Sequence, residues 1–214
     1  AKWTELRDWL KNYADHPGAW RVYKLAQKRK PRGIAMPKRP PARIYHQDKA
    51  SSASALFQTR TKRRIRREVY RLIRRERPTQ ALKYISAKGQ DRRLKAAETD
   101  FLKSLIARSY YIEGKIASSL KLAQEATRSR TRVPMSDWHA GLAAWRLGRS
   151  ELATEHFARL ADTMTVSAQL RARAAYWTAR GLRKAGKISE AEPYFKIAAK
   201  SGPYFYAFLG MQQV

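Results

Sequence analysis

The chain contains 214 residues, with 46 Lys and Arg against 17 Asp and Glu, a formal net charge of +29 and no cysteine. The lack of cysteine excludes disulfides, thiolate nucleophiles and cysteine-ligated metals, and no apolar run of about 18 residues and no signal-peptide pattern occurs, so neither a membrane span nor a leader is expected. With 43% hydrophobic residues the chain should fold, and its charge indicates an anionic partner: nucleic acid, anionic lipid, an acidic protein or an anionic cell-wall polymer.

Residues 1–30 are expected to form an N-terminal helical hairpin. Thr4 is a candidate N-cap for a first helix whose apolar positions, Leu6 and Leu10 among them, follow helical spacing. A turn at residues 15–18 should break this helix, and Pro17 suits the first position of the second helix. The apolar side of that second helix would include Trp20, Tyr23, Leu25 and Ala26.

Residues 31–54 lack any helical or strand pattern. Four prolines and Gly33 exclude a continuous helix there, so we expect a Pro-rich basic linker or a strap lying across the next domain. The strap is slightly favoured because Ile34, Met36, Ile44 and Tyr45 could serve as apolar anchors.

Residues 55–214 have helical periodicity throughout, with breaks at short intervals. Helices of about 12 to 20 residues joined by short turns must pack as antiparallel neighbours, which predicts an all-α array of helical hairpins. The expected breaks lie near Pro78, Gly89, Gly114, Arg132-Val133-Pro134, Gly148, Thr163–Thr165, Gly186 and Gly202-Pro203.

A repeat is visible in the small residues of this region. Positions early in the second helix of each hairpin are separated by 38, 34 and 38 residues, namely Ala81, Ser119, Ala153 and Ala191. A further small residue lies seven positions before each turn glycine, at Ala107, Gly141 and Ala179, where it would let the partner helix approach closely. This spacing is typical of tetratricopeptide repeats and predicts a right-handed superhelix with a concave face. Ser189 to Glu192 is a candidate capping box, although Pro193 then falls at an irregular position.

The basic run from Arg60 to Arg77 contains ten Lys or Arg. Ile65, Val69, Leu72 and Ile73 have the spacing of a buried stripe, so the favoured interpretation is a packed helix with a cationic outer face. The alternative is a surface that holds a polyanion. Nucleic acid is the less favoured polyanion, because no known nucleic-acid module and no interleaved stacking aromatics accompany the charge.

The sequence offers few candidates for chemistry. The four histidines have no zinc-site spacing, and no paired carboxylates, phosphate loop or nucleophile motif occurs, so we expect no catalytic residue, no metal and no cofactor. Most aromatic residues, including Trp138, Trp145 and Phe157, suit a helical core, but some could stack on sugar rings along a concave face. Three consecutive aromatics, Tyr204-Phe205-Tyr206, cannot all face one core.

Two parts of the sequence show a family pattern. Residues 138–212 contain AAYWTAR at 174–180, Ala185-Gly186, Glu190-Ala191 and PYFY at 203–206, and the N-terminal part contains DWLKNYADHP at 8–17 and RKPRG at 29–33. These stretches resemble the soluble lytic murein transglycosylases, in which such a passage ends a helical superhelix just ahead of a lysozyme-like catalytic domain. The family's catalytic Glu motif is absent from this chain, so no catalytic residue is carried over.

The resemblance implies a periplasmic protein that acts on peptidoglycan. The chain would be the non-catalytic superhelix, holding glycan strands or muramyl peptides and supporting a catalytic domain C-terminal to residue 214. Under this hypothesis the binding residues are Arg173, Trp177, Arg180, Tyr204 and Tyr206. Two alternatives remain: a tetratricopeptide-type scaffold that binds an acidic peptide or other proteins, and, less favoured, a basic nucleic-acid-binding protein.

Overall fold

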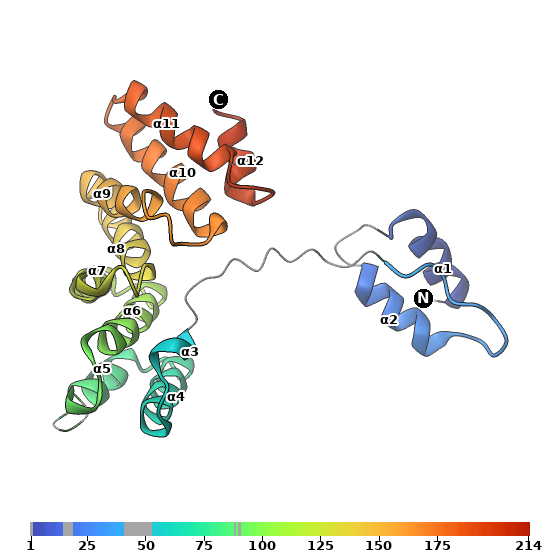
Figure 1. Cartoon of the computed structure of the whole chain (residues 1–214), viewed down its shortest axis with the longest axis horizontal. Coiled ribbons are helices and arrows are strands. Elements are labelled where there is room, and N and C mark those ends of the chain that lie inside the picture. The colour runs from blue at the N-terminus through green and yellow to red at the C-terminus, as the bar shows by residue number, and fades with distance from the viewer. Residues whose placement is uncertain (1, 15–18, 41–52, 88, 90) are drawn as a thin grey trace. The chain divides into compact units, whose positions relative to one another are not determined.

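The computed structural model describes residues 2–14, 19–40, 53–87, 89 and 91–214. Every regular element in these residues is a helix, and none of them is long and apolar enough to cross a membrane. The chain divides into two compact units, Ala1–His46 and Gln47–Val214 (Figure 1). The prediction of an all-α fold is therefore confirmed for the described residues.

The first unit is a pair of helices, α1 (Trp3–Asn12) and α2 (Ala19–Arg29). Its core contains Trp3, Leu6, Leu10, Ala19 and Ala26, with Met36 packed against it. The prediction that Thr4 caps α1 is wrong. The helix begins at Trp3 with Lys2 as its N-cap residue, and the backbone N–H of Lys2 donates to the Glu5 carboxylate at 2.8 Å, which fixes the first turn without a hydroxyl cap.

Some predictions for the first fifty residues fall outside what the structure describes. Pro17, Ile44 and Tyr45 belong to this undescribed part of the chain. Of the other two proposed anchors, Ile34 is 43% exposed, whereas Met36 packs on the α1–α2 core. On the second helix Leu25 is 38% exposed, whereas Ala19 and Ala26 are buried and Val22 and Tyr23 pack against the core.

The second unit is a succession of helices, and from the helix at Arg60–Arg74 onward each packs against the next (Figure 1). The predicted breaks separate these helices, because glycine, proline and polar turn residues end each apolar period. The helices are α3 (Ala53–Leu56), α4 (Arg60–Arg74), α5 (Pro78–Ser86), α6 (Ala96–Ile112), α7 (Ile116–Ala126), α8 (Met135–Arg146), α9 (Ser150–Ala161), α10 (Ala168–Lys184), α11 (Ile188–Ala199) and α12 (Phe205–Met211), with 3-10 turns at Asp91–Arg93 and Thr127–Ser129.

Three hairpins, α6–α7, α8–α9 and α10–α11, have the same turn. Gly114, Gly148 and Gly186 have φ angles of +79°, +76° and +76°, a backbone conformation that favours glycine. After each glycine the next N–H donates at 2.9 Å to a carbonyl five residues earlier, from Lys115, Arg149 and Lys187 to Tyr110, Ala144 and Leu182. This bond closes each first helix and sets the chain's reversal.

The small residues allow the close approach of paired helices that their spacing predicts. A Cβ on Gly141 would lie 2.7 Å from Cδ1 of Phe157, so α8 and α9 meet with the ring directly against the glycine backbone. In the preceding hairpin Ser119 Oγ donates to the backbone carbonyl of Ala107 at 2.8 Å, which requires an equally close approach of α6 and α7. The four repeat positions Ala81, Ser119, Ala153 and Ala191 are all at most 1% exposed.

The predicted capping box at Ser189 to Glu192 is wrong. α11 begins at Ile188, directly after the glycine turn. The hydrogen bond from the Lys187 N–H to the Leu182 carbonyl fixes the backbone just before this residue, so the helix starts without a serine cap. Glu190 instead pairs with Lys187 at 3.5 Å. Pro193 lies inside the helix with its ring exposed. The carbonyl that lacks a hydrogen bond from the missing N–H is therefore on the solvent side, where water can bind it.

α4 carries the basic run. Its N-cap Thr59 accepts a hydrogen bond from the backbone N–H of Lys62 at 3.3 Å, and Ile65, Val69 and Leu72 are buried as their spacing predicts. Burial of this stripe fixes the rotation of the helix. The arginines between the apolar positions are consequently held on its outer side.

Candidate functional site: an aromatic–arginine face on α6, α8 and α10

Three cation–aromatic contacts join the first helices of successive hairpins. The Cζ atom of Arg146 (α8) lies 5.4 Å from the ring centroid of Tyr111 (α6). Arg173 and Arg180 (α10) lie 4.2 Å and 5.7 Å from the rings of Trp138 and Trp145 (α8). Each pair is 35 residues apart in the sequence, so the contact repeats with the hairpins. We call these residues, with Arg108 and Trp177, the aromatic–arginine face.

The centre of this face is an aromatic cluster. Trp145 and Trp177 meet edge to face at 5.2 Å between centroids, and Trp177 also packs against buried Phe157 at 5.8 Å. Arg180 lies over Trp177 at 4.6 Å, and Lys184 Nζ lies 5.3 Å from the Trp145 ring. Cations stacked on rings in this way keep their hydrogen-bond donors available at the edges of the guanidinium or ammonium group.

Arg173 is the most enclosed cation of the face. Its Nη2 contacts the Met135 sulfur at 3.2 Å, and its Nε is buried without a hydrogen-bond partner. Burial lowers the pKa of Arg173, while the neighbouring Tyr206 acts in the opposite direction. No carboxylate neutralises this guanidinium among the described residues, so Arg173 is a charged group with unused donor capacity next to an apolar wall.

Arg108 and Arg173 line one cavity between α6, α8 and α10, of about 470 Å³. No acidic residue lines it. The walls are mainly apolar and aromatic, and the polar atoms come from the two arginines, Ser104, Tyr111 and His139. A second hollow of about 370 Å³ shares Arg173 with this cavity and includes Arg132 and Gln169. An anion with an attached apolar or ring-shaped body fits such a lining, because cationic donors and apolar walls occur together.

His139 is uncharged in this cavity wall. It is 6% exposed, and its Nδ1 forms a hydrogen bond with Ser104 Oγ at 3.0 Å. Burial lowers the pKa of His139 to about 3, with further contributions from the charges of Arg108 and Arg173. The positive charge of the cavity at neutral pH therefore comes from the arginines alone.

Of the five predicted binding residues, four gather around this face. Arg173, Trp177 and Arg180 lie on α10, and Tyr206 packs on Tyr176 at 5.6 Å between ring centroids. Tyr204 is the N-cap residue of α12 and lies outside the two cavities. Phe205, Phe208 and Met211 are 68%, 54% and 54% exposed, which agrees with the expectation that some aromatics at 204–206 turn away from the core.

Five members of the face were not predicted from the sequence: Arg108, Tyr111, Trp138, Trp145 and Arg146. Trp138 and Trp145 were treated as core residues, and Trp138 is indeed only 7% exposed, but its ring also supports Arg173. The missing signal was present in the sequence as the repeated separation of 35 residues between an aromatic and an arginine. A search for repeated pairs, rather than repeated single residues, would have found it.

Acidic side chains in the described part of the chain have structural partners or lie on exposed edges. Asp137 bonds to His156 Nδ1 at 2.8 Å and to Arg130 at 3.1 Å, and Asp100 bonds to Arg128 Nε at 2.8 Å. Glu151 and Glu155 are exposed on α9. Within the described residues no group of three His, Asp or Glu side chains could hold a metal ion.

Comparison of the chain with protein-family models, with curated proteins and with solved structures found no match. The resemblance to lytic murein transglycosylases therefore remains a prediction from the sequence.

Proposed function

We propose that this chain is the non-catalytic helical portion of a periplasmic, lytic-transglycosylase-like protein, and that its aromatic–arginine face holds peptidoglycan. The observation that carries the proposal is the cavity of about 470 Å³ in which Arg108 and Arg173 meet apolar and aromatic walls without an acidic neighbour. Glycan strands with muramyl peptides offer what this lining lacks: carboxylates, and sugar rings whose C–H faces stack on aromatic side chains.

The carboxylates would be bound by the arginines. A guanidinium presents two parallel N–H donors that match a carboxylate, and hydrogen bonds to charged groups are shorter and stronger than neutral ones. Arg173 has the least internal competition for a carboxylate, because its guanidinium lines the cavity and its buried Nε has no hydrogen-bond partner among the described residues. An incoming carboxylate would thus gain a hydrogen bond without first displacing an internal one.

The repeated arrangement suits a polymer better than a small molecule. Arg146, Arg173 and Arg180 recur from hairpin to hairpin, each on an aromatic ring. Weak contacts at several successive positions on one strand add through effective concentration, even where each is worth about 1 kcal/mol or less. In this proposal the hairpins form the right-handed, tetratricopeptide-like superhelix that the sequence predicts, with the aromatic–arginine face on its concave side.

The last helix would contact the catalytic domain. Its exposed Phe205, Phe208 and Met211 lie on a seven-residue helix at the end of the hairpin series. Exposed apolar groups gathered on one short element are common at interfaces between domains. This part of the proposal depends on the family resemblance as well as on the helix.

The test is binding of the chain to purified sacculi and to muramyl dipeptide at low salt, followed by tryptophan fluorescence. Arg108→Gln should weaken binding of the dipeptide about tenfold, since a hydrogen bond to a charged group contributes roughly 1.5–3 kcal/mol. Arg149→Gln, which removes the same charge from an exposed turn residue, should change the affinity less than about twofold.

Three outcomes contradict the proposal. No binding to sacculi at low salt would exclude the glycan, and equal losses in Arg108→Gln and Arg149→Gln would exclude this cavity. Binding of an acidic peptide without binding of muramyl dipeptide would favour the protein-binding scaffold.

A further inference from the structure

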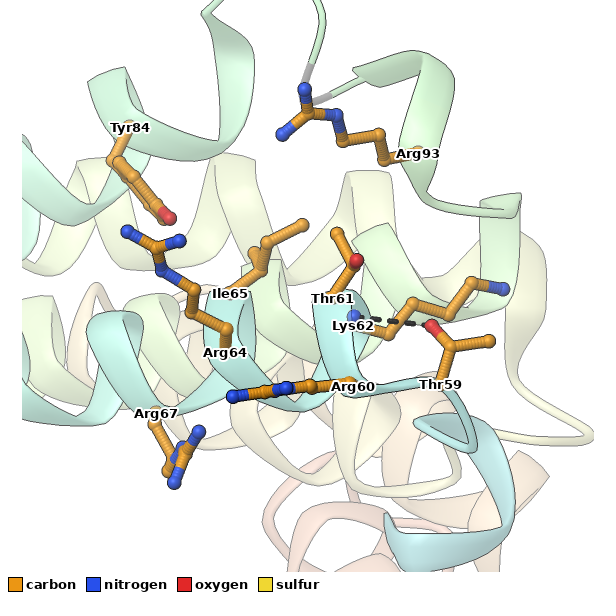
Figure 2. Close-up of a pocket in the computed structure, with 9 residues that line it drawn as sticks. All are labelled: Thr59, Arg60, Thr61, Lys62, Arg64, Ile65, Arg67, Tyr84 and Arg93. Atoms are coloured by element: carbon orange, nitrogen blue, oxygen red, sulfur yellow. Dashed lines mark hydrogen bonds between the residues drawn. The ribbon is translucent and has the colours of Figure 1, made fainter.

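A third hollow, also cationic, lies beside α4 and shares no lining residue with the aromatic–arginine face. It has a volume of about 970 Å³, and its lining comes from three elements: the first half of α4, Tyr84 of α5, and Arg93 of the 3-10 turn Asp91–Arg93. Figure 2 shows the Arg64 guanidinium and the Tyr84 hydroxyl pointing toward one another, with Arg93 reaching toward the same space from the opposite side. Arg60 and Arg67 lie along its lower edge in this view.

Within the described part of the chain, the arginines around this hollow form no ion pair within 4 Å and no side-chain hydrogen bond. The lining contains no acidic residue. Lys62 is engaged by Glu98 at 2.7 Å, but among the described residues no ion pair or hydrogen bond occupies the guanidinium of Arg60, Arg64, Arg67 or Arg93. Elsewhere on the same helix, Arg71 is paired with Glu68 and Arg66 lies over the Phe57 ring at 5.3 Å. Among the described residues, unpaired guanidiniums therefore occur both at the hollow and farther along the exposed side of α4.

The position of these guanidiniums matters more than their number. Like charges that face one hollow repel each other, and the repulsion is relieved when a multiply charged anion occupies the space between them. Arginine binds phosphate oxygens through two parallel N–H donors, and hydroxyl groups such as those of Tyr84 and Thr61 can donate to the remaining oxygens. The donors converge from three elements, so they surround a compact group better than they follow an extended strand.

We propose that the hollow bordered by Arg60, Arg64, Arg67, Tyr84 and Arg93 is a binding site for a phosphomonoester or pyrophosphate group. The ligand is chemically different from the carboxylates proposed for the aromatic–arginine face, and the two sites share no lining residue. The phosphate could belong to a free phosphorylated compound or to a lipid headgroup. The same donors would hold it in either case.

The test is calorimetric titration of the 214-residue chain with inorganic pyrophosphate, comparing two variants that lose the same charge. The variant R64Q/R93Q removes two guanidiniums that face the hollow and should weaken binding at least about tenfold, because charge-assisted hydrogen bonds are lost. The control R74Q/R77Q removes two exposed, unpaired arginines of the same basic run outside the hollow and should weaken binding less than about threefold. All four side chains are exposed, so circular dichroism should show both variants folded.

Vesicles distinguish the two sources of the phosphate. Binding to phosphatidic acid vesicles that is lost in R64Q/R93Q and kept in R74Q/R77Q would assign the site to a lipid headgroup. Selective loss of pyrophosphate binding alone would assign it to a free phosphorylated compound. The proposal is overturned if the chain does not bind pyrophosphate at low salt, or if the two variants weaken its binding equally. It is also overturned if a DNA duplex binds more tightly and both variants weaken that binding alike, which would indicate a nucleic acid along the whole of α4.

Discussion

One buried polar residue, His139, makes the stability of the protein depend on pH and on the charges of the aromatic–arginine face. His139 is held unprotonated by burial and by the charges of Arg108 and Arg173, and its pKa falls from 6.5 to about 3. The unfolded chain takes up a proton on this residue below pH 6.5, whereas the folded chain does not. Stability therefore increases with pH between about 3 and 6.5, and it is lost as the pH falls through that window.

This linkage predicts the pH dependence of unfolding. Between pH 7 and pH 5, His139 should account for a loss of about 2 kcal/mol in the free energy of unfolding. The variant His139→Asn keeps a hydrogen-bonding group toward Ser104 but cannot titrate, so its free energy of unfolding should change less over the same interval. Urea titrations at the two pH values measure the difference. Parallel curves for the two proteins would contradict the assignment.

At the scale of helices, the sequence predicted the elements well because the signals were local. Gly114, Gly148 and Gly186 marked the turns, and the stripe through Ile65 and Val69 fixed the buried side of α4. The two incorrect caps, Thr4 and Ser189, failed for a related reason: a hydroxyl near a helix start resembles a cap, although the actual N-cap residues, Lys2 and Lys187, lie two positions earlier.

The close approach of α8 and α9 gives a test of the repeat at this scale. Gly141→Ala should destabilise the protein by about 1–3 kcal/mol, because the new methyl group would overlap the Phe157 ring. In a Phe157→Leu background the same change should cost clearly less, since the smaller side chain leaves room. Thermal unfolding of the four proteins completes the cycle. Equal costs in both backgrounds would show that the glycine acts through the backbone and not through the ring.

At the scale of the whole molecule, the contacts that sequence reasoning missed join distant residues. Asp137 pairs with His156 and Arg130, Asp100 pairs with Arg128, and Lys62 pairs with Glu98. None of these pairs has the i,i+3 or i,i+4 spacing from which a contact on one helix could be predicted. Three of the eight residues of the aromatic–arginine face, Arg173, Trp177 and Arg180, were predicted, because α10 alone carries them at helical spacing. The other five depend on which helices become neighbours, and that is decided by packing.

The net charge of +29 affects the stability of the folded chain as a whole. Surplus cations repel one another in the compact state, so stability should rise as salt shortens the range of the repulsion. Between about 20 mM and 300 mM NaCl we expect the Tm to rise by about 4 °C, the equivalent of roughly 1–2 kcal/mol for a domain of this size.

The variant R63Q/R74Q/R77Q, which removes three exposed and unpaired arginines of the α4 run, should begin with a higher Tm at low salt and respond less to added salt. Binding of an anionic ligand should have the opposite salt dependence, because the same ions that screen the repulsion compete for the arginines. If the Tm falls as salt is added, ion pairs such as Lys62–Glu98 outweigh the repulsion, and the surplus charge is already compensated within the fold.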